Sequence, residues 1–152
     1  MGKSQWGPPI WIFFHTLAEN VKEDRFKIIG PQIISQIIQI CHNLPCPECT
    51  QHAKLFWSRT KLGTIKTKTD LKNVLYVFHN SVNNRNNKPS FSYEALDMYK
   101  TINVLRAFNF FYANFNTNGN MTLLTEAFHR RRLLESLKKW ISINIHHFDL
   151  HN

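Results

Sequence analysis

Glycine is scarce in this chain, with only five in 152 residues, spread from Gly2 to Gly119. That spacing excludes the G-x-G-x-x-G turn of dinucleotide-binding folds and the G-x-x-x-x-G-K-[ST] loop that cradles nucleotide phosphates. Acidic residues are also few: 10 Asp and Glu stand against 19 Lys and Arg, a net charge of +9. Such an excess of positive charge favours acidic partners or nucleic acid, but it does not determine the fold.

Cysteine and long apolar runs are rare as well. Three Cys are too few for a disulfide-rich secreted scaffold. No apolar run approaches the roughly 18 residues of a membrane span, and a start interrupted by Pro8 and Pro9 does not have the form of a signal peptide. These absences predict a cytoplasmic protein, in reducing surroundings where a close Cys pair serves catalysis or metal binding rather than structure.

Apolar residues recur at helical spacing along nearly the whole chain, and no strand pattern is evident. The expected helices span residues 8–21, 31–43, 46–57, 69–82, 92–105 and 121–145. Gly30-Pro31 is expected to break the chain and start the second helix. Asn43-Leu44-Pro45 is expected to end that helix, because the residue before Pro avoids the helical region. Thr69 and Ser92 are expected to cap the fourth and fifth. The sequence therefore predicts an all-α fold.

The sharpest local motif is Pro45-Cys46-Pro47-Glu48-Cys49, at an expected helix start. Two Cys three residues apart can form a disulfide, and the backbone N–H groups of a helix N-terminus stabilise a thiolate. A dithiol–disulfide oxidoreductase needs this arrangement. However, Cys41, Cys46, Cys49 and His52 also form C-x4-C-x2-C-x2-H, which offers a zinc ion three thiolates and one imidazole. Spacing alone leaves the redox and zinc interpretations equally open.

Two further motifs change that balance when they are taken in order with the Cys pair. Trp11-x-x-x-His15 alone fits a packed aromatic beside a core His, and His79-Asn80-x-Val82-Asn83-x-Arg85-x-x-Lys88-Pro89 alone fits a solvated helix end. Together with Cys46-x-x-Cys49, they resemble the Erv/ALR family of FAD-dependent sulfhydryl oxidases over about residues 6–105. The chain looks most like the short members encoded by large cytoplasmic DNA viruses, and for a viral protein this resemblance implies a location in the host cytoplasm and the virion.

The resemblance implies a four-helix bundle with a short fifth helix that cradles FAD without a Gly-rich loop. It implies that Cys46 and Cys49 form the catalytic pair, and that no metal is needed. The implied cofactor-binding residues are Trp11, His15, Cys49, His52, His79, Asn80, Val82, Asn83, Arg85, Lys88 and Tyr99. The implied reaction forms disulfides in protein thiols: electrons pass from the Cys pair to FAD and then to molecular oxygen, giving hydrogen peroxide.

The same resemblance implies a homodimer, no membrane, and a small thioredoxin-like or CxxC-bearing protein as thiol partner. The chain also departs from the family. Tyr76 and Tyr93 stand where cellular members carry a structural disulfide, and the shuttle CxxC of longer members is missing. Cys41 is the remaining thiol, and we interpret it as a buried small hydrophobe.

The resemblance does not cover the end of the chain, so the predicted division is an oxidase domain, 1–110, and a C-terminal helical extension, 111–152. The expected helix at 121–145 has a broad apolar stripe, with Arg130, Arg131, Lys138 and Lys139 predicted on or near the opposite side. We expect the stripe to pack on the bundle or on a partner. The alternative is a zinc-stabilised basic module that binds nucleic acid through residues 130–132 and 138–139, and it ranks lower because the helix is rich in Leu and Trp.

Overall fold

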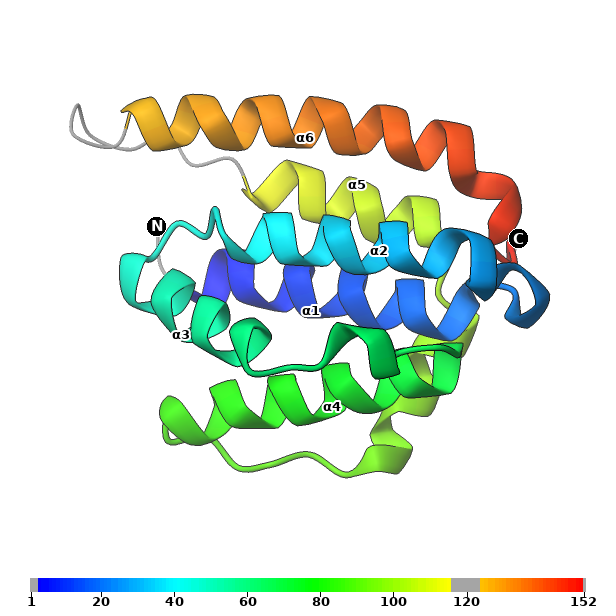
Figure 1. Cartoon of the computed structure of the whole chain (residues 1–152). Helices are drawn as coiled ribbons and strands as arrows, with labels where there is room; N and C mark the ends of the chain where they lie inside the picture. Colours follow the sequence, from blue (N-terminus) through cyan, green and yellow to red (C-terminus); the bar gives the residue numbers. More distant parts are fainter. Residues whose placement is uncertain (1–2, 116–123, 152) are drawn as a thin grey trace.

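The computed structural model describes residues 3–115 and 124–151, and within them all regular structure is helical (Figure 1). The main helices are α1 (Lys3–Asn20), α2 (Phe26–Cys41), α3 (Pro47–Ser58), α4 (Lys68–Arg85), α5 (Val104–Phe115) and α6 (Leu124–Asn144). Short 3-10 helices are η1 (Glu23–Arg25), η2 (Leu62–Thr64), η3 (Tyr93–Thr101) and η5 (Ile145–His147). The all-α prediction is confirmed.

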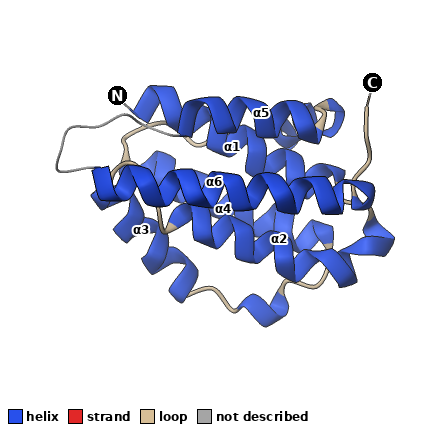
Figure 2. Ribbon diagram, turned by 90° about the horizontal axis from the view of Figure 1, so that it is seen from above, coloured by secondary structure: helices blue, strands red, loops and turns tan. Residues whose placement is uncertain are grey.

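The bundle is organised around α1, whose residues from Phe13 to Asn20 are all buried. Helices α4 and α5 and the 3-10 helix η3 pack against α1, and α3 packs against α2. Helix α6 lies across α2 and α5 as an outer layer (Figures 1 and 2). Large apolar side chains such as Phe13, Phe14 and Phe111 are fully enclosed between these helices. Burial of this kind is the main stabilising contribution to folding.

The predicted break at Gly30-Pro31 is wrong, because α2 begins at Phe26 and continues through both residues. Proline disfavours a helical residue before it through clashes with that residue's backbone N–H and Cβ, and glycine lacks the Cβ. The Phe26 ring fills the vacant space, since a Cβ added at Gly30 would lie 2.5 Å from its Cε1 atom. Similarly, α1 begins at Lys3 and includes Pro8 and Pro9.

The N-cap of α4 is Thr67 rather than the predicted Thr69. The Asp70 N–H donates to Thr67 Oγ1 at 3.1 Å, and the Thr67 N–H donates to Asp70 Oδ2 at 3.1 Å. This reciprocal pair is a capping box, with Asp in the place more often taken by Glu. The backbone N–H groups of Lys66 and Thr67 lower the pKa of the Asp70 carboxyl.

The helix expected over 92–105 is two elements. Ser92 precedes the 3-10 helix η3, without a side-chain cap, and α5 begins only at Val104. Asn103 separates the two, because its Oδ1 accepts from the N–H groups of Leu105 at 2.8 Å and Arg106 at 3.2 Å. The predicted domain division at residue 110 falls inside α5.

The predicted amphipathic helix at the C-terminal end is α6, and residues 121–123 of the prediction lie outside the described part of the chain. Its buried face carries Ala127, Arg130, Leu134, Leu137 and Ile141. The placement of Arg130 opposite the apolar stripe is wrong, because it lies three residues after Ala127 and four before Leu134, on the same face. None of the described helices is long and apolar enough to cross a membrane.

The two tyrosines that the resemblance aligns with a family disulfide, Tyr76 and Tyr93, touch each other. The Tyr76 and Tyr93 rings pack edge to face, with centroids 5.2 Å apart at an interplanar angle of 80°. The Tyr76 hydroxyl donates to the Phe91 carbonyl at 3.1 Å, and the Tyr93 hydroxyl donates to Asn73 Oδ1 at 2.6 Å. This tyrosine pair holds the segment after α4 against that helix.

Candidate functional site

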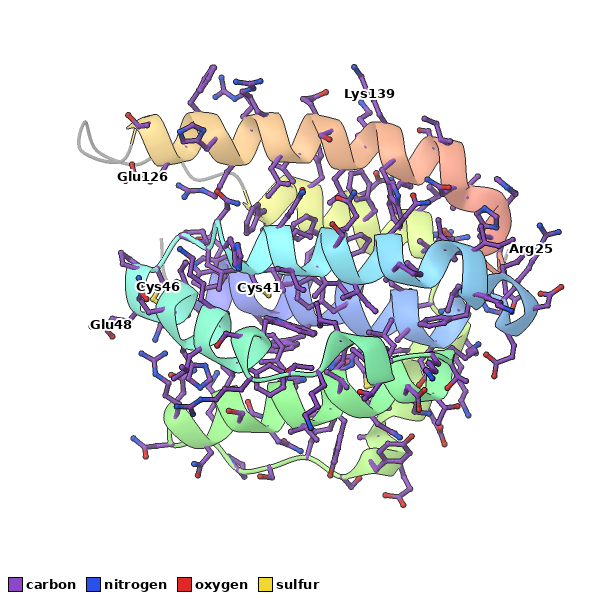
Figure 3. The ribbon with its side chains drawn as sticks, in the orientation of Figure 1. Arg25, Cys41, Cys46, Glu48, Glu126 and Lys139 are labelled. Carbon is purple, nitrogen blue, oxygen red and sulfur yellow. A yellow bond between two sulfur atoms is a disulfide. The ribbon has the colours of Figure 1, made fainter. Side chains whose placement is uncertain are left out.

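The Cys pair begins helix α3. Cys46 is the N-cap residue, with an extended backbone, and Pro47 occupies the first helical position, where its missing N–H is not needed. Cys46 and Cys49 are joined by a disulfide, with Cα atoms 5.2 Å apart. Cys46 Sγ accepts a hydrogen bond from the Cys49 N–H at 3.2 Å. Figure 3 shows Cys46 and Glu48 at one end of the molecule, where α3 starts.

A cavity of about 360 Å³ lies beside this pair, a size within the usual range for small-molecule and cofactor sites. Cys49 lines it, whereas Cys46 does not. Its walls come from α1, α2, α3, α4 and η3. The structure brings nine of the eleven predicted cofactor-binding residues to this cavity: Trp11, Cys49, His52, His79, Val82, Asn83, Arg85, Lys88 and Tyr99.

The two remaining predicted residues, His15 and Asn80, do not line the cavity but contact residues that do. His15 Nε2 is 2.9 Å from His79 Nδ1, and the His15 ring stacks on Tyr99 with centroids 4.9 Å apart. Asn80 makes paired bonds to Phe91: its Nδ2 donates to the carbonyl at 3.2 Å, and its Oδ1 accepts from the N–H at 3.0 Å. Both residues therefore position neighbours of the cavity, and their predicted direct contact with a cofactor stays a prediction.

One wall of the cavity is aromatic. The Trp11 and His79 rings are stacked almost parallel, with centroids 4.0 Å apart and an interplanar angle of 5°. The Trp11 and Phe78 rings also pack edge to face, with centroids 5.1 Å apart. Flat, polarisable surfaces of this kind suit a planar heteroaromatic ligand.

The cavity is also lined by three positively charged residues: Lys3, Arg85 and Lys88. None of the described residues that line the cavity is acidic. Arg85 pairs with Glu48 at 3.7 Å, but that carboxylate is largely in solvent and neutralises it weakly. A cavity with three cations and aromatic walls suits a ligand that joins flat rings to phosphates. Sequence reasoning missed Lys3, because the first helix was expected to begin after it.

Burial keeps both stacked histidines neutral. It lowers the pKa of His15 to about 3, with a further contribution from the neighbouring His79. It lowers the pKa of His79 to about 4, with a further contribution from Lys88. A neutral imidazole carries one donor and one acceptor, so the His15–His79 bond needs complementary tautomers.

These lowered pKa values predict acid sensitivity. The unfolded chain protonates both rings near pH 6.5, so the free energy of unfolding falls as the pH drops below 6.5, and it continues to fall until about pH 3–4. At pH 5 the lowered pKa of His15 should reduce the free energy of unfolding by about 2 kcal/mol relative to neutral pH. Urea unfolding of flavin-free protein at pH 7 and pH 5 measures it. His15→Phe keeps an aromatic ring but removes the titrating group, so its free energy of unfolding should fall less between pH 7 and pH 5. An equal fall would contradict the assignment of this acid sensitivity to His15.

Cys41 is the third thiol, and the structure confirms that it is buried, with 1% of its surface exposed. It projects from α2 and lines the cavity (Figure 3). Burial raises its pKa to about 12, against a weaker opposing effect of Trp57. The thiol is therefore protonated at neutral pH and is a poor nucleophile.

We expect Cys41→Ser to retain the bound flavin and most of the thiol-dependent activity that the family resemblance implies. It should lower the free energy of unfolding by about 1–2 kcal/mol, because a hydroxyl is costlier to bury than a thiol. Urea unfolding and flavin content measure the two effects. Loss of activity with flavin retained would show instead that Cys41 carries electrons.

The zinc interpretation finds no support in this geometry. Among the residues that the structure describes, no three His, Cys, Asp or Glu side chains are grouped to hold a metal ion. Two of the four residues in the C-x4-C-x2-C-x2-H pattern are bonded to each other, and the Cys41 thiol is enclosed in the core.

The fold and site define a helical-bundle protein with a disulfide-bonded Cys pair beside a cavity that has aromatic and cationic walls. The Erv1 / Alr family model matches residues 8–104, and the chain belongs to that family. The FAD-linked sulfhydryl oxidase of African swine fever virus (Warthog/Namibia isolate) is 31% identical over 97 residues, covering 64% of this chain and 78% of the relative. A protein of Invertebrate iridescent virus 6 is 30% identical over 90 residues, covering 55% and 81% respectively. No solved structure matches the chain significantly.

Proposed function

We propose that the chain is an FAD-linked sulfhydryl oxidase that forms disulfides in protein thiols. The observation that carries this proposal is the Cys46–Cys49 disulfide at the start of α3, with Cys49 lining a cavity that has aromatic and cationic walls. The African swine fever virus relatives, named FAD-linked sulfhydryl oxidases, support it.

The two Cys have different tasks. A substrate thiolate attacks Sγ of Cys46, which does not line the cavity, and forms a mixed disulfide while Cys49 leaves as a thiolate. A second substrate thiolate then attacks the substrate sulfur and releases the product disulfide and the Cys46 thiolate. The Cys49 N–H and the α3 N-terminus stabilise that thiolate, which makes Cys46 a good leaving group.

The cavity fits FAD by the chemistry of its walls. Trp11, His79 and Tyr99 would contact flat rings, and Lys3, Arg85 and Lys88 would bind the pyrophosphate. When bound, FAD supplies two-electron redox chemistry that links the reduced Cys pair to oxygen and yields hydrogen peroxide. Because their lowered pKa values keep His15 and His79 neutral, neither adds positive charge to the site. Lys3, Lys88 and Arg85 are then the groups that would bind an anion.

We also propose that a small thioredoxin-like or CxxC-bearing protein is the direct thiol partner. The support is that the chain has three Cys and no second CxxC to relay electrons. We propose a homodimer, supported by Leu105 and Phe110, which are both partly exposed on α5 and leave apolar surface to cover. Mass in solution tests the dimer.

A viral source and action in the host cytoplasm are part of the same proposal. Their support is that proteins of African swine fever virus and two invertebrate iridescent viruses match this chain.

Oxygen consumption with a model dithiol is the test of the proposal. The purified protein should carry a flavin spectrum, consume oxygen in proportion to dithiol, and produce one hydrogen peroxide per disulfide. A colourless protein that neither takes up FAD nor consumes oxygen would refute the proposal. The nucleic-acid alternative is weakened by Arg130, one of its expected contacts, because only 3% of that residue is exposed.

A further inference from the structure

The chain folds back over the end of α1 after α6. The Lys22 N–H donates to the His147 carbonyl at 2.9 Å, and the Asp149 N–H donates to the Asn20 carbonyl at 2.7 Å. Phe148 pairs with Val21 in an isolated β-bridge, and only 2% of it is exposed. Residues 147–151, here named the C-terminal strap, lie outside the segment that the family model matches.

The strap meets Asn20, a polar side chain of which only 1% is exposed. Asn20 Nδ2 faces three backbone carbonyls, at 3.0 Å from Thr16, 3.0 Å from Tyr99 and 3.3 Å from Ile102. Because these acceptors fix the amide orientation, Oδ1 is the acceptor for His151 Nε2 at 2.7 Å. Asn20 therefore joins α1, the end of η3 and the strap.

The end of η3 that Asn20 holds belongs to the cavity wall. Tyr99, whose carbonyl accepts from Asn20, lines the cavity and stacks on His15. Its ring sits on a 3-10 helix, a form with poorer hydrogen-bond geometry than an α-helix. The position of this wall thus depends on a bond from another element.

We propose that Asn20 and His151 are positioning residues for the bound cofactor: His151 fixes the Asn20 amide, and Asn20 fixes the Tyr99 wall. The inference rests on the proposed function only for the identity of the ligand, FAD. Loss of the His151 donor leaves a buried amide oxygen without this partner, and a polar group so placed seeks another orientation.

The strap's contribution to stability comes from different residues. Phe148 is buried and packs against Trp140, whose Nε1 donates to Gln32 Oε1 on α2 at 2.9 Å. His151 is exposed and buries little surface. Changes at His151 therefore separate positioning from general stabilisation.

The test measures release of FAD from the holoprotein after dilution, followed by the rise in flavin fluorescence. His151→Phe keeps the ring and loses the donor, and we expect release to be about three- to tenfold faster. His151→Gln restores a donor and should release FAD at nearly the wild-type rate. Asn20→Ala removes every bond of the amide and should have the largest effect, about tenfold or more.

Leu137→Ala is the matched control, because Leu137 is fully buried in α6 and its apolar side chain takes no part in the hydrogen bonds of Asn20. It should lower the melting temperature and leave FAD release unchanged at temperatures where the protein is folded. Wild-type release rates in both His151→Phe and Asn20→Ala would overturn the inference.

Amide hydrogen exchange gives a readout that does not need flavin. The Ile102 N–H, bonded to the Tyr99 carbonyl at 3.3 Å, should exchange faster in His151→Phe, while amides of α3 stay unchanged. Equal exchange at Ile102 in both proteins would also overturn the inference. If the wild-type protein retains no FAD, the proposed function fails, and this exchange measurement alone decides the role of the strap.

Discussion

Replacing either Cys46 or Cys49 with Ser is expected to reduce thiol-dependent oxygen consumption to the rate of a buffer blank, while the protein stays folded and retains flavin. The one Cys that remains at the start of α3 can then no longer form the intramolecular disulfide that receives electrons from substrate. Retention of flavin is expected because the aromatic and cationic walls of the cavity are untouched. Oxygen electrode measurements and the flavin absorbance of the purified variants test both parts.

The two variants should differ spectroscopically. In Cys46→Ser the remaining Cys49 thiol faces the cavity, and its thiolate beside oxidised flavin should give a long-wavelength absorption band. In Cys49→Ser the remaining Cys46 does not line the cavity, so the band should be absent. Cys41→Ser is the matched control, since it removes the third thiol and should leave turnover largely intact. Full dithiol oxidase activity in Cys49→Ser would refute the assignment.

Truncation after Phe115, which removes α6 and the C-terminal strap, is expected to leave a chain that aggregates or melts at a much lower temperature. Leu134, Leu137 and Ile141 are buried against the bundle, so their loss uncovers apolar surface on α2 and α5. Contiguous surface of this kind promotes association. Melting temperature and mass in solution, measured beside flavin content, test this expectation.

A graded version avoids the loss of an entire helix. Leu137→Ala in the full chain should lower the free energy of unfolding by about 2–5 kcal/mol, a large part of the roughly 5–15 kcal/mol of a typical domain. Flavin content and the flavin spectrum should not change. A truncated chain as stable as the full one, with the same mass per particle, would show that α6 serves to dock a partner instead.

Helical periodicity was enough to predict the fold, because most helices here bury one regular face. It failed where a local effect outweighs the pattern. Pro31 is tolerated inside α2 because Gly30 lacks a Cβ and the Phe26 ring takes its place, a contact between side chains that no residue count reveals. The sequence offers both Ser92 and Asn103 as cap residues for this part of the chain. The prediction used Ser92, whereas Asn103 is the residue whose side chain caps the start of α5.

The site was predictable where a motif orders its residues, as in Cys46-x-x-Cys49 and the cluster from His79 to Lys88. The sequence could not predict which of these residues line the cavity and which only contact lining residues, because that depends on packing between helices. Lys3 reaches the cavity only because α1 starts earlier than the prolines suggest. The link from His151 to Asn20 joins residues 131 positions apart, and no local pattern marks it.

The contact between Tyr76 and Tyr93 limits how many electrons the Cys residues of this chain can take up. Because Tyr76 and Tyr93 hold their two segments together without a covalent bond, the single disulfide of this three-Cys chain is the one at the start of α3. A titration with reductant should therefore take up two electrons per polypeptide in the absence of flavin. Thiol reagents on the denatured protein should then count one sulfhydryl before reduction and three after it. Reduction of the Cys46–Cys49 disulfide should therefore break no covalent cross-link elsewhere in the fold.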